Sequence, residues 1–304
     1  MKTIDFMGQR KLAFIFSALL IIASIASLST KQLNWGLDFT GGTLVEVHYS
    51  ETADLEAIRE TLTTGGYAGA VVVSFGTDRD VLIRLPQGFS DKEGVAILEI
   101  LQAKFAGSVE LRRIEFVGPQ VGDELREQGG LAMLLALGLV MLYIAFRFQF
   151  KFAVGAVVAL VHDVIVTLGF FSIIGMEFDL TVLAALLAVI GYSLNDTIVV
   201  SDRIRENFRK IRRAEPVEVI NISLTETLGR TLVTSLTTLL VLMALALFGG
   251  EMINGFAIAL IVGVMIGTYS SIYVAANTLL VLGVSKEDLM IPVKEGAEQE
   301  DLTP

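Results

Sequence analysis

The sequence predicts an α-helical membrane protein of six transmembrane helices, with one ferredoxin-like α+β domain outside the membrane. Hydrophobic residues make up 53% of the 304 residues and charged residues only 18%. The apolar residues gather in six stretches, and a helix needs roughly 20 such residues to cross a bilayer. Between the first two stretches lies a segment that is polar enough to fold in water. The stretches are 12–29, 129–147, 152–174, 179–200, 228–248 and 254–283.

This pattern divides the chain into four parts. We expect a cytoplasmic N-terminus with the first transmembrane helix over 1–30, and an external domain over 31–125. The remaining five transmembrane helices follow over 126–284, and an acidic cytoplasmic tail completes the chain over 285–304.

The distribution of Lys and Arg predicts the orientation, because these residues are enriched in the cytoplasmic segments of membrane proteins. The two short turns at 175–177 and 249–254 contain neither residue type. We therefore expect both termini in the cytoplasm and the 31–125 domain outside. The basic residues on the opposite side are Lys2, Arg10, Lys11, Arg147, Lys151, Arg203, Arg205, Arg209, Lys210, Arg212 and Arg213.

An alternative for the first apolar stretch is a cleavable signal peptide. A basic start, an apolar run and the small-x-small sequence Ser24-Ile25-Ala26 fit that pattern. The run is about 18 residues long, which is enough to span a membrane, so we favour an uncleaved helix. The orientation of the other five spans is the same in both cases.

The external segment shows the order β-α-β-β-α-β, which is typical of a split βαβ, ferredoxin-like domain. Apolar and polar residues alternate as in a half-buried strand over 43–49, and helical spacing appears over 54–64 and 91–105. Nothing in this segment resembles a catalytic site, so we expect it to bind or move. His48 has no second metal ligand nearby in sequence, and we expect it to face water. The other expected strands are 71–75, 81–85 and 109–117.

Two opposite charges lie inside expected spans, where charge is costly and usually functional. At 1.5 Å per residue, Asp196 lies about 25 Å into the fourth span, and Arg230 about 27 Å from the end of the fifth. The matched depth makes a pairing geometrically plausible. One interpretation is a carboxylate that gains and loses a proton. The alternative is a static salt bridge, or side chains that reach toward the cytoplasmic interface.

Further polar residues in the spans are consistent with a hydrated path for protons. His162 and Asp163 fall near the middle of the third span, and Asn195 adjoins Asp196. His162 and Asp163 could instead be a mutually bonded pair. Hydroxyl residues recur at helical spacing along the fifth span, where they could equally join helices. The residues of this fifth-span stripe are Thr227, Thr231, Thr234 and Thr238.

The sixth span carries a ridge of small residues at every fourth position, including a GxxxG pair, Gly263 and Gly267. Such a ridge lets another helix approach closely, either for packing within the chain or as a sliding surface. The other members are Gly255, Ala259, Ser271 and Ala275.

Several classes of function lack their sequence signatures. The chain has no cysteine, and its net charge of −10 argues against a nucleic-acid partner. No phosphate-binding G-x-x-x-x-G-K-[ST] loop is present. We therefore expect no enzyme activity, no metal and no cofactor, and an ion gradient as the energy source.

Long motifs in this chain closely resemble the SecF branch of the SecD/SecF family of protein-export membrane proteins. One is the segment over 36–43, GLDFTGGT, with Gly36, Asp38, Gly41 and Gly42. The composition of this segment is also typical of a Gly-rich turn that leads into a strand near the membrane surface. The others are VHDV over 161–164, GYSLNDT over 191–197 with DRIREN over 202–207, and TLGRT over 227–231.

The resemblance implies a half-transporter of the RND type in a bacterial inner membrane, with the domain in the periplasm. It implies SecD as partner, with the Sec channel (SecY, SecE and SecG), accessory subunits such as YajC, unfolded secretory proteins and membrane lipid. The proton motive force would drive late steps of translocation, and Asp196 and Arg230 would belong to the proton pathway. With six spans, the chain would need a second carboxylate from SecD. Alternatives are an RND-type small-molecule exporter and a non-transporting scaffold of the channel.

Overall fold

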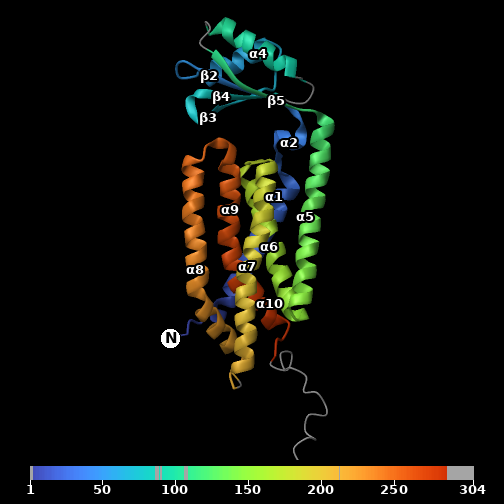
Figure 1. Cartoon of the computed structure of the whole chain (residues 1–304), viewed down its shortest axis with the longest axis vertical. Coiled ribbons are helices and arrows are strands. Elements are labelled where there is room, and N and C mark those ends of the chain that lie inside the picture. The colour runs from blue at the N-terminus through green and yellow to red at the C-terminus, as the bar shows by residue number, and fades with distance from the viewer. Residues whose placement is uncertain (1–2, 86–88, 90, 106–108, 212, 286–304) are drawn as a thin grey trace, which may run out of the picture.

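In the computed structural model, which describes residues 3–85, 89, 91–105, 109–211 and 213–285, six long helices stand side by side beneath a small α/β domain (Figure 1). Within these described residues, six helical segments are long and apolar enough to cross a membrane, which confirms the predicted fold class. The expected acidic tail lies outside the described residues beyond Ser285. The first five of the six candidate membrane-spanning helices are α1 (Arg10–Thr30), α5 (Pro119–Arg147), α6 (Phe150–Ile174), α7 (Leu180–Lys210) and α8 (Pro216–Phe248).

The sixth span contains a π turn near its C-terminal end. It consists of α9 (Glu251–Ser270), a π-helical turn (Ser271–Ala275) and α10 (Ala276–Val281). Such π turns appear mostly as single bulges within α-helices, frequently at functional sites.

Three helices are longer than the expected spans. α5 begins ten residues earlier than expected, α7 continues ten residues further, and α8 begins at Pro216 instead of 228. The basic segment after the fourth span is therefore mostly helical. Its residues stay helical because they bury apolar side chains, among them Phe208 and Ile220.

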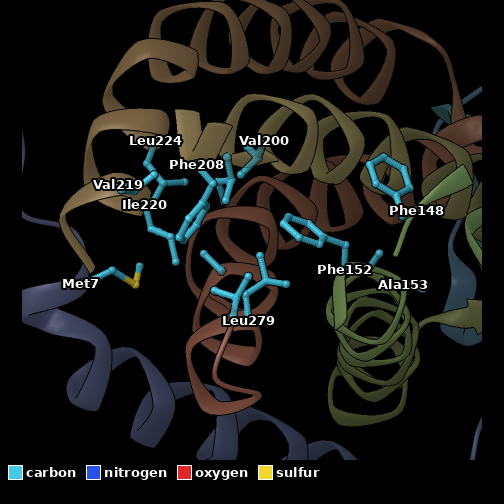
Figure 2. Packing of buried hydrophobic residues seen from close by; sticks show 14 of the residues in the cluster. Met7, Phe148, Phe152, Ala153, Val200, Phe208, Val219, Ile220, Leu224 and Leu279 are labelled. Atoms are coloured by element: carbon cyan, nitrogen blue, oxygen red, sulfur yellow. The ribbon is translucent and has the colours of Figure 1, made fainter. Parts of the chain in front are cut away.

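A hydrophobic cluster closes the end of the bundle that lies away from the sheet. Figure 2 shows Met7, Phe152, Phe208 and Leu279 converging from four segments of the chain. Met7 begins a short 3-10 helix (Met7–Gln9), and its backbone N–H donates to Oδ1 of Asn221 over 2.9 Å. The chain before α1 is thereby packed against α8.

The domain between the first two spans has the predicted β-α-β-β-α-β order. It comprises β2 (Gly42–Tyr49), α3 (Leu55–Thr64), β3 (Val71–Phe75), β4 (Thr77–Leu85), α4 (Asp91–Lys104) and β5 (Val109–Val117). The antiparallel sheet has the order β3-β4-β2-β5, and its core includes Val45, Ile58 and Leu101. β4 starts four residues earlier than expected, since Gly76 makes a tight turn at φ +76°.

His48 differs from expectation. Instead of facing water alone, its Nδ1 lies 2.6 Å from Oδ1 of Asp80, and the imidazole is 27% exposed. Both residues lie on paired strands, β2 and β4, directly opposite one another. The pairing register, which the sequence does not reveal, creates this contact.

Three short elements were not expected. β1 (Asn34–Trp35) pairs in parallel with β6 (Glu177–Phe178), and α2 (Leu37–Thr40) occupies the segment expected as a Gly-rich turn. They connect the chain that leaves α1 to the turn between α6 and α7. These pairings join residues about 140 positions apart, so no local pattern could indicate them.

α7 lies inside the bundle, in contact with α6, α8 and α9. α1 packs on α6, where Ser27 Oγ and Ser172 Oγ lie 2.8 Å apart. α5 and α8 stand at opposite edges in Figure 1, and few residues of their apolar stretches are buried.

Candidate functional site

The most deeply buried charged group in the bundle is Asp163 on α6, with no solvent-exposed surface. Its Oδ1 lies 2.9 Å from Nδ1 of His162. Its Oδ2 accepts hydrogen bonds from Ser193 Oγ on α7 over 2.5 Å and from Ser270 Oγ on α9 over 2.7 Å. Asp163 therefore joins three helices at one point, and every oxygen of its carboxylate has a partner.

The sequence predicted the His162–Asp163 contact as one of two interpretations, but missed the two serines. Ser193 belongs to the GYSLNDT motif and Ser270 lies beside the ridge of small residues. Both are common residue types on helices far away in the chain, so only tertiary packing brings them to Asp163. The outer nitrogen of the imidazole, Nε2 of His162, is buried and has no hydrogen-bond partner.

Asp196 on α7 has a different environment. It is 3% exposed, yet its Oδ2 makes no hydrogen bond. On α8, Thr231 is 2% exposed and its hydroxyl also lacks a partner. A buried polar atom without a partner costs about 1–3 kcal/mol, so each of these atoms would be stabilised by gaining a hydrogen-bond partner.

One contact between α7 and α8 places Asp196 and Thr231 at the same level. Tyr192 OH donates to Ser235 Oγ over 3.5 Å. Asp196 lies one turn beyond Tyr192, and Thr231 lies one turn before Ser235. Because the two helices run in opposite directions, both steps lead the same way along the bundle. The two unpartnered groups therefore share one section of the α7–α8 interface.

Arg230 does not pair with Asp196. Its side chain is exposed, and no ion pair within 4 Å joins the two residues in the described part of the chain. The pairing that matched depth made plausible is thus absent as a contact. Adjacent residues on a helix point about 100° apart, so Arg230 and Thr231 face different directions. Of the two, Thr231 faces inward.

Two further predicted residues also point outward. Asn195 and Thr234 are exposed. The Thr234 hydroxyl donates to backbone carbonyls of its own helix, at Arg230 (3.1 Å) and Thr231 (3.0 Å). The expected hydroxyl face of the fifth span is therefore divided, with Thr227 and Thr231 buried and the later threonines bonded to their own helix.

The ridge of small residues on the sixth span lies against α7. A Cβ atom added to Gly267 would lie 3.0 Å from Cβ of Ser193, and one added to Gly263 would collide with Val189. One turn later, Thr197 Oγ1 and Ser271 Oγ lie 2.8 Å apart, where the π turn begins. This close approach is what allows Ser270 to reach Asp163.

The glycine-rich segment after the first span meets the outer end of α7. Oδ2 of Asp38 accepts a hydrogen bond from the backbone N–H of Leu180 over 3.0 Å. A Cβ on Gly36 would lie 2.8 Å from Oε1 of Glu177, so the two segments nearly touch. Gly41 and Gly42 have φ angles of +69° and +137°, which favour glycine. These residues connect the external domain to the helix that carries Asp196.

A second link joins the sheet itself to this turn. Arg84 on β4 forms an ion pair with Glu177, next to the start of α7. Nearby, the guanidinium of Arg126 on α5 lies 4.4 Å from the centre of the Trp35 ring. The domain is thus attached to the bundle through side chains as well as through the chain.

Comparisons with known proteins agree with this architecture. Residues 97–285 match the family "Protein export membrane protein SecD/SecF, C-terminal", and residues 26–53 match the "SecD/SecF GG Motif". The protein translocase subunit SecF of Vibrio alginolyticus is 56% identical, covering 99% of this chain and 97% of its own. That of Escherichia coli O157:H7 is 45% identical, covering 100% and 96%.

Solved structures show the same likeness. The crystal structure of SecDF from Thermus thermophilus, described as a translocon-associated membrane protein, superposes with a TM-score of 0.82 at 38% identity. The alignment covers 92% of this chain but only 39% of the Thermus chain. A SecDF structure in a super-membrane-facing form gives a TM-score of 0.71 at 39% identity. The chain therefore belongs to the SecD/SecF family of protein export membrane proteins.

Proposed function

We propose that this multi-pass membrane protein is a SecF-type subunit of the Sec protein-export machinery. With SecD, it uses the proton motive force to drive late steps of protein translocation across the bacterial inner membrane. The observation that carries the proposal is the buried, unpartnered carboxylate oxygen of Asp196. The relatives are named protein translocase subunits, so the small-molecule exporter and the scaffold are not favoured.

Asp196 is suited to bind and release a proton because no hydrogen bond to its Oδ2 has to be broken first. Asp163 is the contrasting case, since three side chains hold its carboxylate. We therefore assign proton exchange to Asp196, and to Asp163 the task of holding α6, α7 and α9 together. His162 lies beside Asp163, and its unpartnered Nε2 is a second candidate site for binding a proton.

The exposed face of α7 and α8 supports SecD as the partner that completes the pathway. Arg230, Asn195 and Thr234 are polar residues at membrane depth, and all three are exposed in the single chain. Polar groups are costly against lipid, so a second polypeptide is expected to cover them. This chain aligns with only 39% of the Thermus SecDF chain. The remainder of that longer chain is available to supply such a second half.

The connection to the external domain gives proton exchange a mechanical output. About 24 Å of α7 separates Asp196 from Leu180, whose N–H is bonded to Asp38. A shift of α7 on protonation would act on the domain through Asp38 and through the Arg84–Glu177 pair. In this proposal both termini are cytoplasmic and the domain is periplasmic. The Sec channel, YajC and the unfolded substrate complete the assembly.

The test is Asp196→Asn, which mimics the neutral state and retains size. We expect normal protein levels and SecD association, with loss of the stimulation of late translocation by a proton gradient in membrane vesicles. Asp163→Asn is the matched control and should lower protein levels. Full gradient-dependent activity of Asp196→Asn at normal levels would exclude the proton role.

A further inference from the structure

A membrane-facing groove lies between α1, α6 and α10, in the half of the bundle away from the sheet. Its volume is about 600 Å³, within the range of about 300–1,000 Å³ that is typical of ligand sites. The lining is almost entirely apolar. It includes Phe14, Ala18 and Ile22 of α1, Val158 and Val161 of α6, and Val281 of α10. His162 reaches the groove, whereas Asp196 and the link to the sheet domain do not line it.

The groove is only about as long as one leaflet. Along α6 it ends near Ile165, which is 14 residues or about 21 Å from Lys151. Beyond that level α1 and α6 close on each other, since Ser24 packs against Gly169 and Ser27 bonds to Ser172. A transmembrane helix of a partner needs about 30 Å. A lipid of one leaflet, with chains covering about half of that thickness, fits the available length.

Basic side chains lie at the open end of the groove. Arg10 and Lys11 are one turn before the first α1 residues that line it, and they continue the same helical face. No carboxylate of the described residues forms an ion pair with either. Lys151 lies on the groove face of α6, and its Nζ donates to the carbonyl of Gly283 beside Val281 over 2.9 Å. Arg10 and Lys11 therefore place two positive charges where a headgroup would lie.

We infer that this groove binds one anionic phospholipid of the cytoplasmic leaflet. Its acyl chain lies against Ala18 and Val161, and its phosphate lies near Arg10 and Lys11. Apolar area provides the attraction for the chain, and the cations provide preference for a negative headgroup.

The test uses the full chain purified with its partner from membranes that contain phosphatidylglycerol and phosphatidylethanolamine, with retained lipid counted by native mass spectrometry. Ala18→Trp fills the groove. Leu19→Trp is its control, because Leu19 points outward on the same helix and is 61% exposed. We expect the wild-type chain and Leu19→Trp to retain one phosphatidylglycerol, and Ala18→Trp to lose it.

Headgroup preference is tested with Arg10→Gln and Lys11→Gln, with Lys31→Gln at the other end of α1 as control. In vesicles of phosphatidylcholine with added phosphatidylglycerol, each groove variant should lower the preference for phosphatidylglycerol about fivefold. Equal lipid retention by Ala18→Trp and Leu19→Trp, or no headgroup preference in the wild type, would overturn the inference. The inference would also be overturned if Ala18→Trp left lipid retention unchanged but released a partner chain or abolished a crosslinked dimer of this chain. The groove would then be a protein interface.

Discussion

At the scale of single residues, two aspartates of one bundle differ in how their carboxylates are satisfied. Asp163 receives bonds from two serines and lies against His162, whereas Oδ2 of Asp196 has none. From the sequence alone, Asp163 and Asp196 are both carboxylates within membrane spans, and nothing distinguishes their environments. The difference arises from which side chains the neighbouring helices present at each level. It is the basis on which we propose a structural role for Asp163 and proton exchange for Asp196.

Ser270→Ala tests the holding role of Asp163. It removes one of the hydrogen bonds to a buried carboxylate, which we expect to lower stability by about 1–3 kcal/mol. Thermal unfolding of the purified protein in detergent measures the effect. Thr234→Ala is the matched control, because that hydroxyl is exposed and bonds only to its own helix. Equal melting temperatures for Ser270→Ala and the wild type would show that Asp163 does not need this bond.

Asp80 gives a pH-dependent prediction for the external domain. Hydrogen bonds from Thr77 and from His48 lower the pKa of Asp80 below its usual range. A depressed pKa means that this contribution is present above pH of about 4 and is lost as the pH falls further. Urea unfolding of the domain, followed by circular dichroism, should show a difference between wild type and Asp80→Asn at neutral pH. That difference should shrink in acid; a pH-independent difference would contradict the assignment.

At the scale of elements, the contact between α7 and α9 determines the geometry of the site. Gly267 faces Ser193, and Gly263 faces Val189. The same spacing brings Ser270 to Asp163 and Ser271 to Thr197. The period of small residues was visible in the sequence, but the helix they face was not. The π turn that follows was not visible either.

Gly267→Leu tests this contact. The larger side chain must displace α7, and overpacking costs about 1–3 kcal/mol. We expect lower protein levels or loss of SecD association, measured by quantitative blotting and co-purification. Gly138→Leu on α5 is the control, since no atom lies within 4 Å of a Cβ at that position. Unchanged levels and partner binding in Gly267→Leu would mean that the two helices can separate at this point.

At the scale of the whole molecule, two structural units meet at one end of the bundle. The sheet domain contacts the membrane helices through the Arg84–Glu177 ion pair and through Asp38 at the start of α7. Trp35, with Phe39 and Phe178 packed around it, fills the space beneath. Motion of α7 therefore has a direct route to the domain, as the proposed coupling requires.

The orientation of the whole molecule is tested by reporter fusions. We expect reporters placed after Lys31, Gly175 or Gly250 to be external, and those after Lys151 or Arg213 to be cytoplasmic. The reason is the absence of Lys and Arg from the two outer turns. A cytoplasmic result for the reporter after Lys31 would reverse the topology.

The sequence by itself determined the parts of this protein whose cause is local. Six spans follow from apolar length, and the βαββαβ order follows from the residue period, so both could be predicted without knowing any neighbour. The tertiary structure decided what depends on contacts between distant segments. It brought Ser193 and Ser270 to Asp163, left Asp196 without a hydrogen bond on Oδ2, and turned Arg230 outward. The physical reason is that the satisfaction of a buried polar atom depends on the facing helix, and helix packing is not encoded at any single position.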